Sequence, residues 1–190
     1  MPILGVLASA ITGNLVTNSY ESIATVTVGG TNQTSIEFTS IPATFKHLQI
    51  RSISRDSRAA TLNTLSLQVN GDTGNNYTYH TIIASDSGVD SDGSASLTNS
   101  TDYLVNTGAN EAASIFAASI LDILDYTDTN KYKTIKMAGG VESNSSISRL
   151  NFTSSLWVNS NAITSLKFIM SGSGVGFTQY TQFALYGIKG

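Results

Sequence analysis

The sequence contains no cysteine among its 190 residues, so neither disulfide bonds nor thiolate metal sites can contribute to its stability. Charged residues are also scarce, at 12% of the chain, which is about half their fraction in an average soluble protein. The net charge is −3, so the chain has no broad attraction to phosphate backbones. We therefore expect no nucleic-acid partner, and stability must come from packing and assembly.

Small polar residues replace charge, since the chain holds 27 serines, 23 threonines and 15 asparagines. Threonine suits strands, and serine and asparagine suit turns. The long helix formers Glu, Lys and Arg are few, whereas Val, Ile, Phe and Tyr recur throughout. A chain of this length can bury about 70% of its unfolded surface in a single core. The composition therefore predicts one all-β domain.

Short runs of alternating apolar and polar residues recur along the chain, each ended by turn residues. The clearest alternation, at 65–69, is followed by Asn70 and Gly71, which accept a positive φ. The predicted strands occupy residues 24–28, 36–38, 48–51, 65–69, 77–84, 120–124, 131–137, 146–157, 163–170 and 181–188. About nine or ten strands without intervening helices predict an antiparallel β-sandwich of jelly-roll type.

Residues 110–126 satisfy two patterns. Phe116, Ile120 and Ile123 fit helical spacing behind a possible Asn110 cap. We favour a strand, because 120–124 is rich in β-formers and 131–137 returns after a polar turn, as in a hairpin.

Residues 85–101 are rich in Asp, Ser and Gly and have almost no apolar anchor, which predicts a long surface loop. Asp86, Asp90 and Asp92 place three carboxylates in this loop, and such oxygen-rich loops can hold calcium. Their spacing matches no known calcium loop, and no glutamate closes the site. We therefore predict no metal site and keep the three aspartates as binding candidates only.

Residues suited to catalysis are few. His47 and His80 are the only histidines, and neither lies in a nucleophile or metal motif. Both are expected to be packing or surface residues, so the sequence predicts no enzyme, no catalytic residue and no cofactor. Two basic groups occur, one of Arg51, Arg55 and Arg58 and one of Lys131, Lys133 and Lys136. We expect them at the surface, with Lys131 and Lys133 on one face, where solubility or ion pairs between subunits explain them at least as well as an anionic ligand does.

The chain begins with an apolar segment, residues 1–19, followed by the predicted sandwich over 20–190. No basic residue precedes Lys46, and the apolar stretch is shorter than the roughly 20 residues that span a bilayer. Export or membrane insertion is therefore the poorer interpretation. Because exposed apolar patches usually mark contacts, we expect this segment to dock on another subunit.

Several segments stand out along the chain. They are Met1-Pro2-Ile3-Leu4-Gly5, residues 23–28, Lys46-His47-Leu48-Gln49-Ile50-Arg51, Asn130-Lys131-Tyr132-Lys133-Thr134 and Phe183-Ala184-Leu185-Tyr186-Gly187-Ile188-Lys189-Gly190. These segments resemble a family of small structural proteins encoded among the virion genes of tailed bacteriophages. The similarity spans the whole chain, apart from 85–101. It implies a β-sandwich without catalytic residues and a place in the virion, as a tail-fibre or capsid-decoration protein.

Three functions follow, in order of preference. The first is a virion surface protein, expected as a homotrimer whose N-terminal segment contacts other virion proteins. The second is a receptor-binding module for host polysaccharide, which could use the aromatic residues Tyr77, Tyr79, Tyr103 and Trp157. The third is a polysaccharide hydrolase, for which no pair among the acidic residues stands out.

Overall fold

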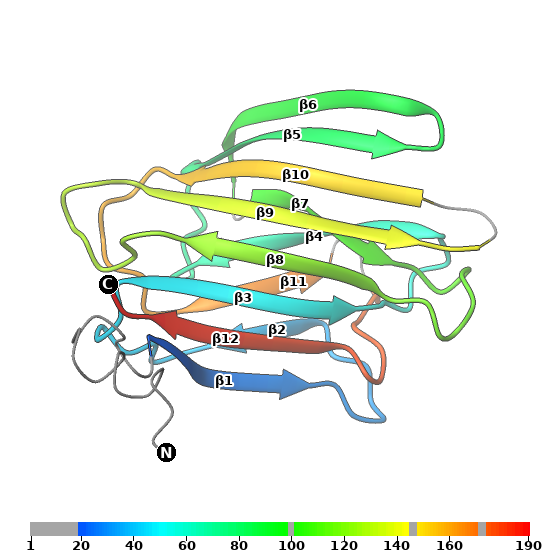
Figure 1. The fold of residues 1–190 in the computed structure, drawn as a ribbon, viewed down its shortest axis with the longest axis horizontal. Helices are drawn as coiled ribbons and strands as arrows, with labels where there is room; N and C mark the ends of the chain where they lie inside the picture. The colour runs from blue at the N-terminus through cyan, green and yellow to red at the C-terminus, as the bar shows by residue number, and fades with distance from the viewer. Residues whose placement is uncertain (1–18, 99–100, 145–147, 171–173) are drawn as a thin grey trace, which may run out of the picture.

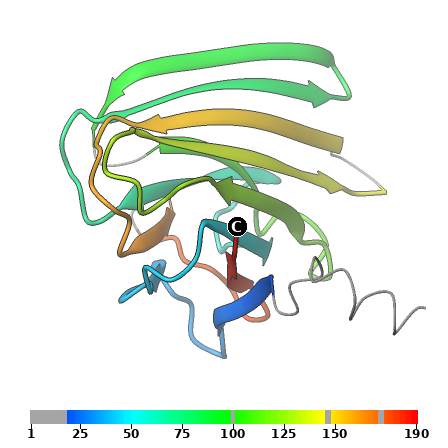
Figure 2. The same ribbon diagram turned by 60° about the vertical axis from the view of Figure 1, so that its left-hand side comes forward.

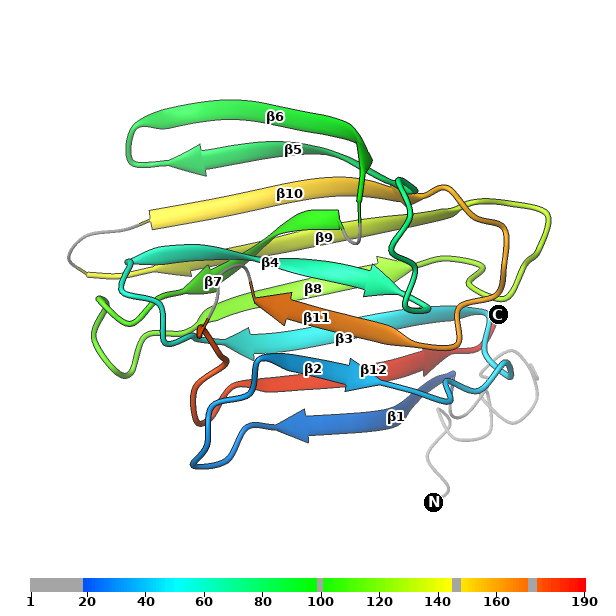
Figure 3. The ribbon, with the colours of Figure 1, turned by 180° about the vertical axis from the view of Figure 1, so that it is seen from behind.

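Two antiparallel β-sheets packed face to face make up the fold (Figure 1). The computed structural model describes residues 19–98, 101–144, 148–170 and 174–190. In order across the larger sheet, the strands are β1 (Tyr20–Thr27), β12 (Gln182–Ile188), β3 (His47–Ser54), β8 (Ala117–Ile123), β9 (Lys133–Glu142), β10 (Ser148–Trp157), β5 (Tyr77–Ser85) and β6 (Gly88–Leu97). The smaller sheet, in front in Figure 3, contains β2 (Ser35–Phe38), β11 (Leu166–Met170), β4 (Leu62–Val69) and β7 (Thr101–Thr107).

The all-β sandwich predicted from the sequence is confirmed, and none of the described residues forms a helix. The strand interpretation of the ambiguous region is also confirmed, because β8 covers Ala117–Ile123 and pairs antiparallel with β9. The jelly-roll form stays a prediction. Across the residues that the structure describes, no helical segment has the length and hydrophobicity of a membrane span.

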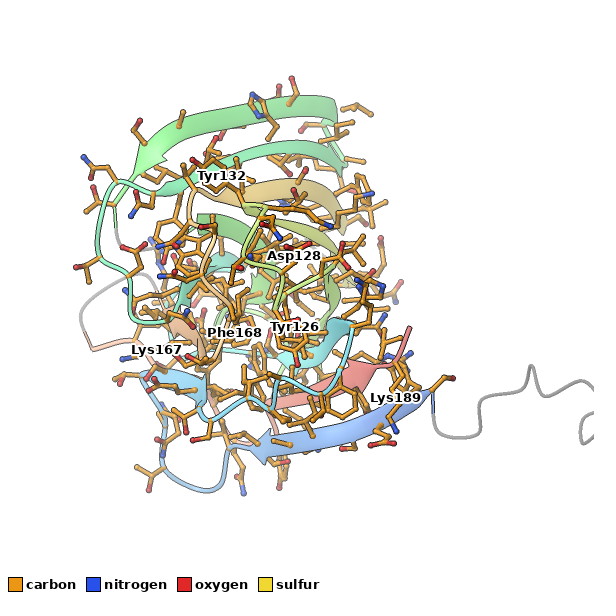
Figure 4. All side chains as sticks on the ribbon, turned by 90° about the vertical axis from the view of Figure 1, so that its left-hand side faces the viewer. Tyr126, Asp128, Tyr132, Lys167, Phe168 and Lys189 are labelled. Carbon is orange, nitrogen blue, oxygen red and sulfur yellow. The ribbon has the colours of Figure 1, made fainter. Side chains whose placement is uncertain are left out.

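The core lies between the two sheets, which appear as separate layers in Figure 2. On β3, Leu48 and Ile50 point inward and are fully buried, whereas Arg51 is exposed, as the alternation predicts. At the centre, the ring of Phe168 on β11 lies 4.6 Å from the ring of Phe183 on β12, centroid to centroid. Figure 4 labels Phe168 within this layer of side chains.

The prediction of a loop over 85–101 is wrong, and the described residues form twelve strands instead of nine or ten. Ser85 pairs with Gly88, so the turn is tight, and ten residues of polar β6 then form the edge of the larger sheet. An edge strand needs no apolar anchor on either face, and its charges discourage pairing with other chains. The second missed strand, β7, lacks alternation because residues 104–107 are all buried.

One arginine of the predicted surface group is buried and structural. Arg55 is 7% exposed, and its guanidinium donates hydrogen bonds to the carbonyl oxygens of Ala109, Glu111, Ala112 and Ile115 at 2.6–3.2 Å. These four residues belong to the connection between β7 and β8. The surface position predicted for Arg55 is therefore wrong, and its side chain holds this connection against the sandwich.

Lys133 also departs from its predicted exposed position. The side chain is 1% exposed, and its ammonium group donates to the carbonyl oxygens of Asp128, Lys131 and Ser160. Burial lowers the pKa of Lys133. The alternation argument placed Lys131 and Lys133 on one face, but β9 begins only at Lys133, so the period of two does not extend back to Lys131.

Candidate functional site

The outer face of the larger sheet, which faces the viewer in Figure 1, carries large apolar side chains that remain exposed. They are Ile53 (53% exposed), Ile82 (56%), Ile120 (44%), Leu150 (59%) and Phe152 (55%). They come from β3, β5, β8 and β10, which lie far apart in the sequence. Alternation places them opposite the core-facing residues of the same strands. The smaller sheet packs on the other face, so these side chains are left uncovered.

Strand register arranges these residues in two neighbouring rows, called here the apolar rows. One row runs through the directly paired residues Arg51, Ile120, Ala138, Phe152 and Ile82. The other runs through Ile53, Ala118, Gly140, Leu150 and Ala84. The next row along the strands is polar and runs through Gln49, Asp122, Lys136, Ser154 and His80. The apolar rows therefore form one patch with a polar border.

The apolar rows are not flat, because β9 contributes only Ala138 and Gly140, which lie beside the larger Leu150 and Phe152 of β10. The result is a furrow of about 570 Å³. A second hollow of about 550 Å³ lies beyond Phe152 and is lined by Ile82 and His80. A Cβ atom at position 140 would lie only 2.7 Å from the carbonyl oxygen of Arg149, so glycine keeps the furrow floor open.

Arg51 is the one charged residue of the apolar rows, and aromatic rings hold it in place. Its guanidinium lies 5.4 Å from the ring centroid of Tyr20 and 5.7 Å from that of Tyr186. The two rings stack at 4.8 Å, and burial raises the pKa of Tyr20. This end of the patch is thus an ordered cation–π arrangement.

The three predicted binding aspartates do not converge on a site. Asp86 lies in the β5–β6 turn and accepts a hydrogen bond from the Ser148 amide, whereas Asp90 and Asp92 lie on β6. Asp92 accepts from Tyr79 Oη at 3.1 Å and from the amide of the next residue. Within the described parts of the chain, no three His, Cys, Asp or Glu residues come together as a metal site would require.

We accordingly expect calcium to leave the protein unchanged. Addition of millimolar calcium should not raise the melting temperature, because these carboxylates already accept hydrogen bonds within the protein. Differential scanning fluorimetry with calcium, and with magnesium as a control, measures this. A rise that calcium alone produces, and that Asp90→Asn removes, would contradict the expectation.

Among the described residues, one histidine lies near an acid, since His47 Nδ1 is 3.8 Å from Asp125 Oδ1. His47 Nδ1 accepts a hydrogen bond from the backbone amide of Asp125 at 3.0 Å, which gives this ring a packing role at the start of β3. His80 is exposed on the outer face, in the polar row.

The aromatic residues considered for sugar binding belong mainly to the core. Tyr77, Tyr79 and Trp157 are each 7% exposed or less, and burial raises the pKa of Tyr77 to about 12. Trp157 Nε1 donates to an Asp72 carboxylate oxygen at 2.7 Å, so its polar atom is satisfied inside the protein. The side chain of Tyr103 lies outside the described residues. The described aromatic residues of this set therefore present no sugar-stacking surface.

A small ion-pair group near the β8–β9 turn gives a pH-dependent contribution to stability. Lys131 and Lys46 donate to Asp125, and these hydrogen bonds lower its pKa to about 2. A carboxyl whose folded-state pKa is depressed stabilises the fold above its unfolded pKa near 4 and loses that effect as pH falls toward 2.

Asp125→Asn should therefore lower the melting temperature at pH 7, and the difference from the native chain should shrink between pH 4 and pH 2. Asparagine tolerates the positive φ of 48° at this position, so the backbone is preserved. Thermal melts over this pH range provide the measurement. A difference that stays constant down to pH 2 would show that the carboxylate charge is not responsible.

The fold and its surface define this chain as an all-β sandwich protein with one uncovered apolar sheet face. Comparison with protein-family models, with curated proteins and with solved structures found no match.

Proposed function

We propose that the protein is a structural subunit of a tailed-phage type virion, displayed on the particle surface and held there through subunit contacts. The observation that carries this proposal is the patch formed by the apolar rows. Large contiguous apolar patches on soluble proteins typically mark contacts with other proteins. With five large apolar side chains 44–59% exposed on one sheet face, an assembly role accounts for the surface better than a free monomer does.

Other features support the same proposal. Charged residues make up only 12% of the chain, which suits close packing of many copies. The segments described above also resemble virion proteins. The homotrimer and the docking role of residues 1–19 stay predictions, and residues 1–18 lie outside the described part of the chain. The polysaccharide-binding alternative has lost the aromatic residues Tyr77, Tyr79 and Trp157 that favoured it, because they are buried.

The proposal is tested by looking for this chain in purified particles. Particles produced by the genome that encodes the chain are separated on a density gradient and analysed by mass spectrometry. We expect the chain at many copies per particle, and gold-labelled antibodies should place it on the outer surface. Its absence from intact particles, together with its presence in the soluble fraction, would contradict the proposal.

A further inference from the structure

A ridge and a furrow lie side by side on the outer face of the larger sheet. The ridge consists of Leu150 and Phe152 on β10, and the furrow floor consists of Gly140 and Ala138 on β9. Register pairs Leu150 with Gly140 and Phe152 with Ala138, so the ridge and the floor share the same level along the strands. A surface of this kind complements itself when a second copy is turned by 180° about an axis along the strands, midway between β9 and β10.

We propose that this face binds the same face of a second copy through a twofold contact on that axis. The inference rests on the proposed function in one respect, that the uncovered face is a subunit contact. In this arrangement Phe152 lies over the partner's Ala138, and Leu150 lies over the partner's Gly140. Each ridge thus enters the other copy's furrow. Two sheets packed about 10 Å apart with strands nearly aligned are an ordinary layer arrangement.

The same rotation exchanges β8 with β5, and the residues that then meet are also compatible. Ile120 faces the partner's Ile82, because both lie in the row that contains Ala138 and Phe152. In the adjoining polar row, Asp122 faces the partner's His80. A twofold axis repeats each of these pairs, so the rotation matches large with small, apolar with apolar, and acid with base.

This agreement of shape, hydrophobicity and charge favours a second copy over an unrelated partner, whose surface need not follow the register of this sheet. A twofold contact forms a dimer, and combined with the threefold symmetry predicted from the sequence it forms a hexamer of three dimers. The mass in solution is then an even multiple of the 20.0 kDa chain.

The test uses two variants of the full chain, Ile120→Glu and Ile82→Lys. Each places an unpaired charge against an isoleucine of the partner, so each should weaken the dimer by about thirtyfold or more. In an equimolar mixture the introduced carboxylate faces the introduced ammonium, and the mass of a dimer should return. Tyr180→Glu is the matched control, because Tyr180 is 69% exposed but lies outside the apolar rows, and it should keep the mass of the native chain.

Analytical ultracentrifugation supplies the masses, and thermal melts confirm that each variant is folded. A native chain that is monomeric at high concentration, single variants that stay dimeric, or a mixture of folded variants that does not recover the dimer would each overturn the twofold contact. A monomer that is nevertheless found in purified particles overturns this inference and leaves the proposed function standing. A dimer that is absent from particles overturns the proposed function and leaves the twofold contact standing.

Discussion

Arg55→Met is expected to lower the free energy of unfolding by about 3–5 kcal/mol. Methionine keeps the length and most of the packing of the side chain but donates no hydrogen bonds. The carbonyl oxygens of Ala109, Glu111, Ala112 and Ile115 then lose the hydrogen bonds that the guanidinium donates to them. Because Arg55 is 7% exposed, water has little access to replace those bonds.

Denaturant unfolding followed by fluorescence of Trp157, the single tryptophan, measures this loss. Arg51→Met is the matched control, since Arg51 is exposed and its guanidinium contacts the rings of Tyr20 and Tyr186 and the side chain of Gln49, with no buried carbonyl oxygens among its partners in the described part of the chain. That change should cost about 1 kcal/mol or less. Equal losses for the two variants would contradict the structural role assigned to Arg55.

Phe168→Ala is expected to lower the free energy of unfolding by about 3–5 kcal/mol as well. The Phe168 ring is 1% exposed, lies 4.6 Å from the ring of Phe183 and meets Phe38 edge-on at 6.5 Å. Its removal leaves a cavity between two sheets whose strand pairing resists collapse. The loss therefore includes both the transfer of a phenyl group and the cavity.

Phe152→Ala makes the same chemical change on the uncovered face, where the phenyl group is 55% exposed. In dilute solution, below the concentration at which copies associate, it should change the free energy of unfolding by only about 0.5 kcal/mol. Chemical denaturation of both variants provides the comparison. A large loss for Phe152→Ala in a monomer would mean that this face is covered within the chain itself.

The sequence predicted well those strands whose two faces differ. Leu65, Leu67 and Val69 alternate with less apolar residues, and all three are buried on β4. The turn after them uses Asn70 and Gly71 at φ values of 51° and 66°, as their residue types indicated. Period-2 alternation succeeds here because one face is apolar and meets the core, whereas Thr64 and Gln68 on the other face are polar and stay partly exposed.

The two strands that were not predicted from the sequence lack this difference between their faces. β6 is exposed over most of its length as an edge strand, with only Ser94 and Leu97 half-buried, and the described side chains of β7 are buried on both faces. Neither produces an alternating pattern. Lys133 was misplaced for a different reason, because its burial depends on three carbonyl oxygens supplied by the turn before β9 and by residues near Ser160.

The apolar rows could not be read from the sequence, because they arise only when strands distant in the chain pair in a fixed register. Ile120, Leu150 and Phe152 lie on strands that the sequence identified, but alternation does not say which face the second sheet covers. One signal was available on β8, since Ile120 is apolar although it lies between the buried residues Ser119 and Leu121. A strand that is apolar or small on both faces of an otherwise polar protein indicates a second contact.

The central claim is that the uncovered sheet face becomes covered when subunits assemble, and thiol labelling tests it most directly. The chain has no cysteine, so Leu150→Cys supplies the only thiol. In the assembled protein this thiol should react with maleimide at least about tenfold more slowly than in the dissociated Ile120→Glu background, because a partner excludes the reagent. A control thiol from Tyr180→Cys should react rapidly in both. Equal reactivity of the thiol at position 150 in the assembled and dissociated states would contradict the account.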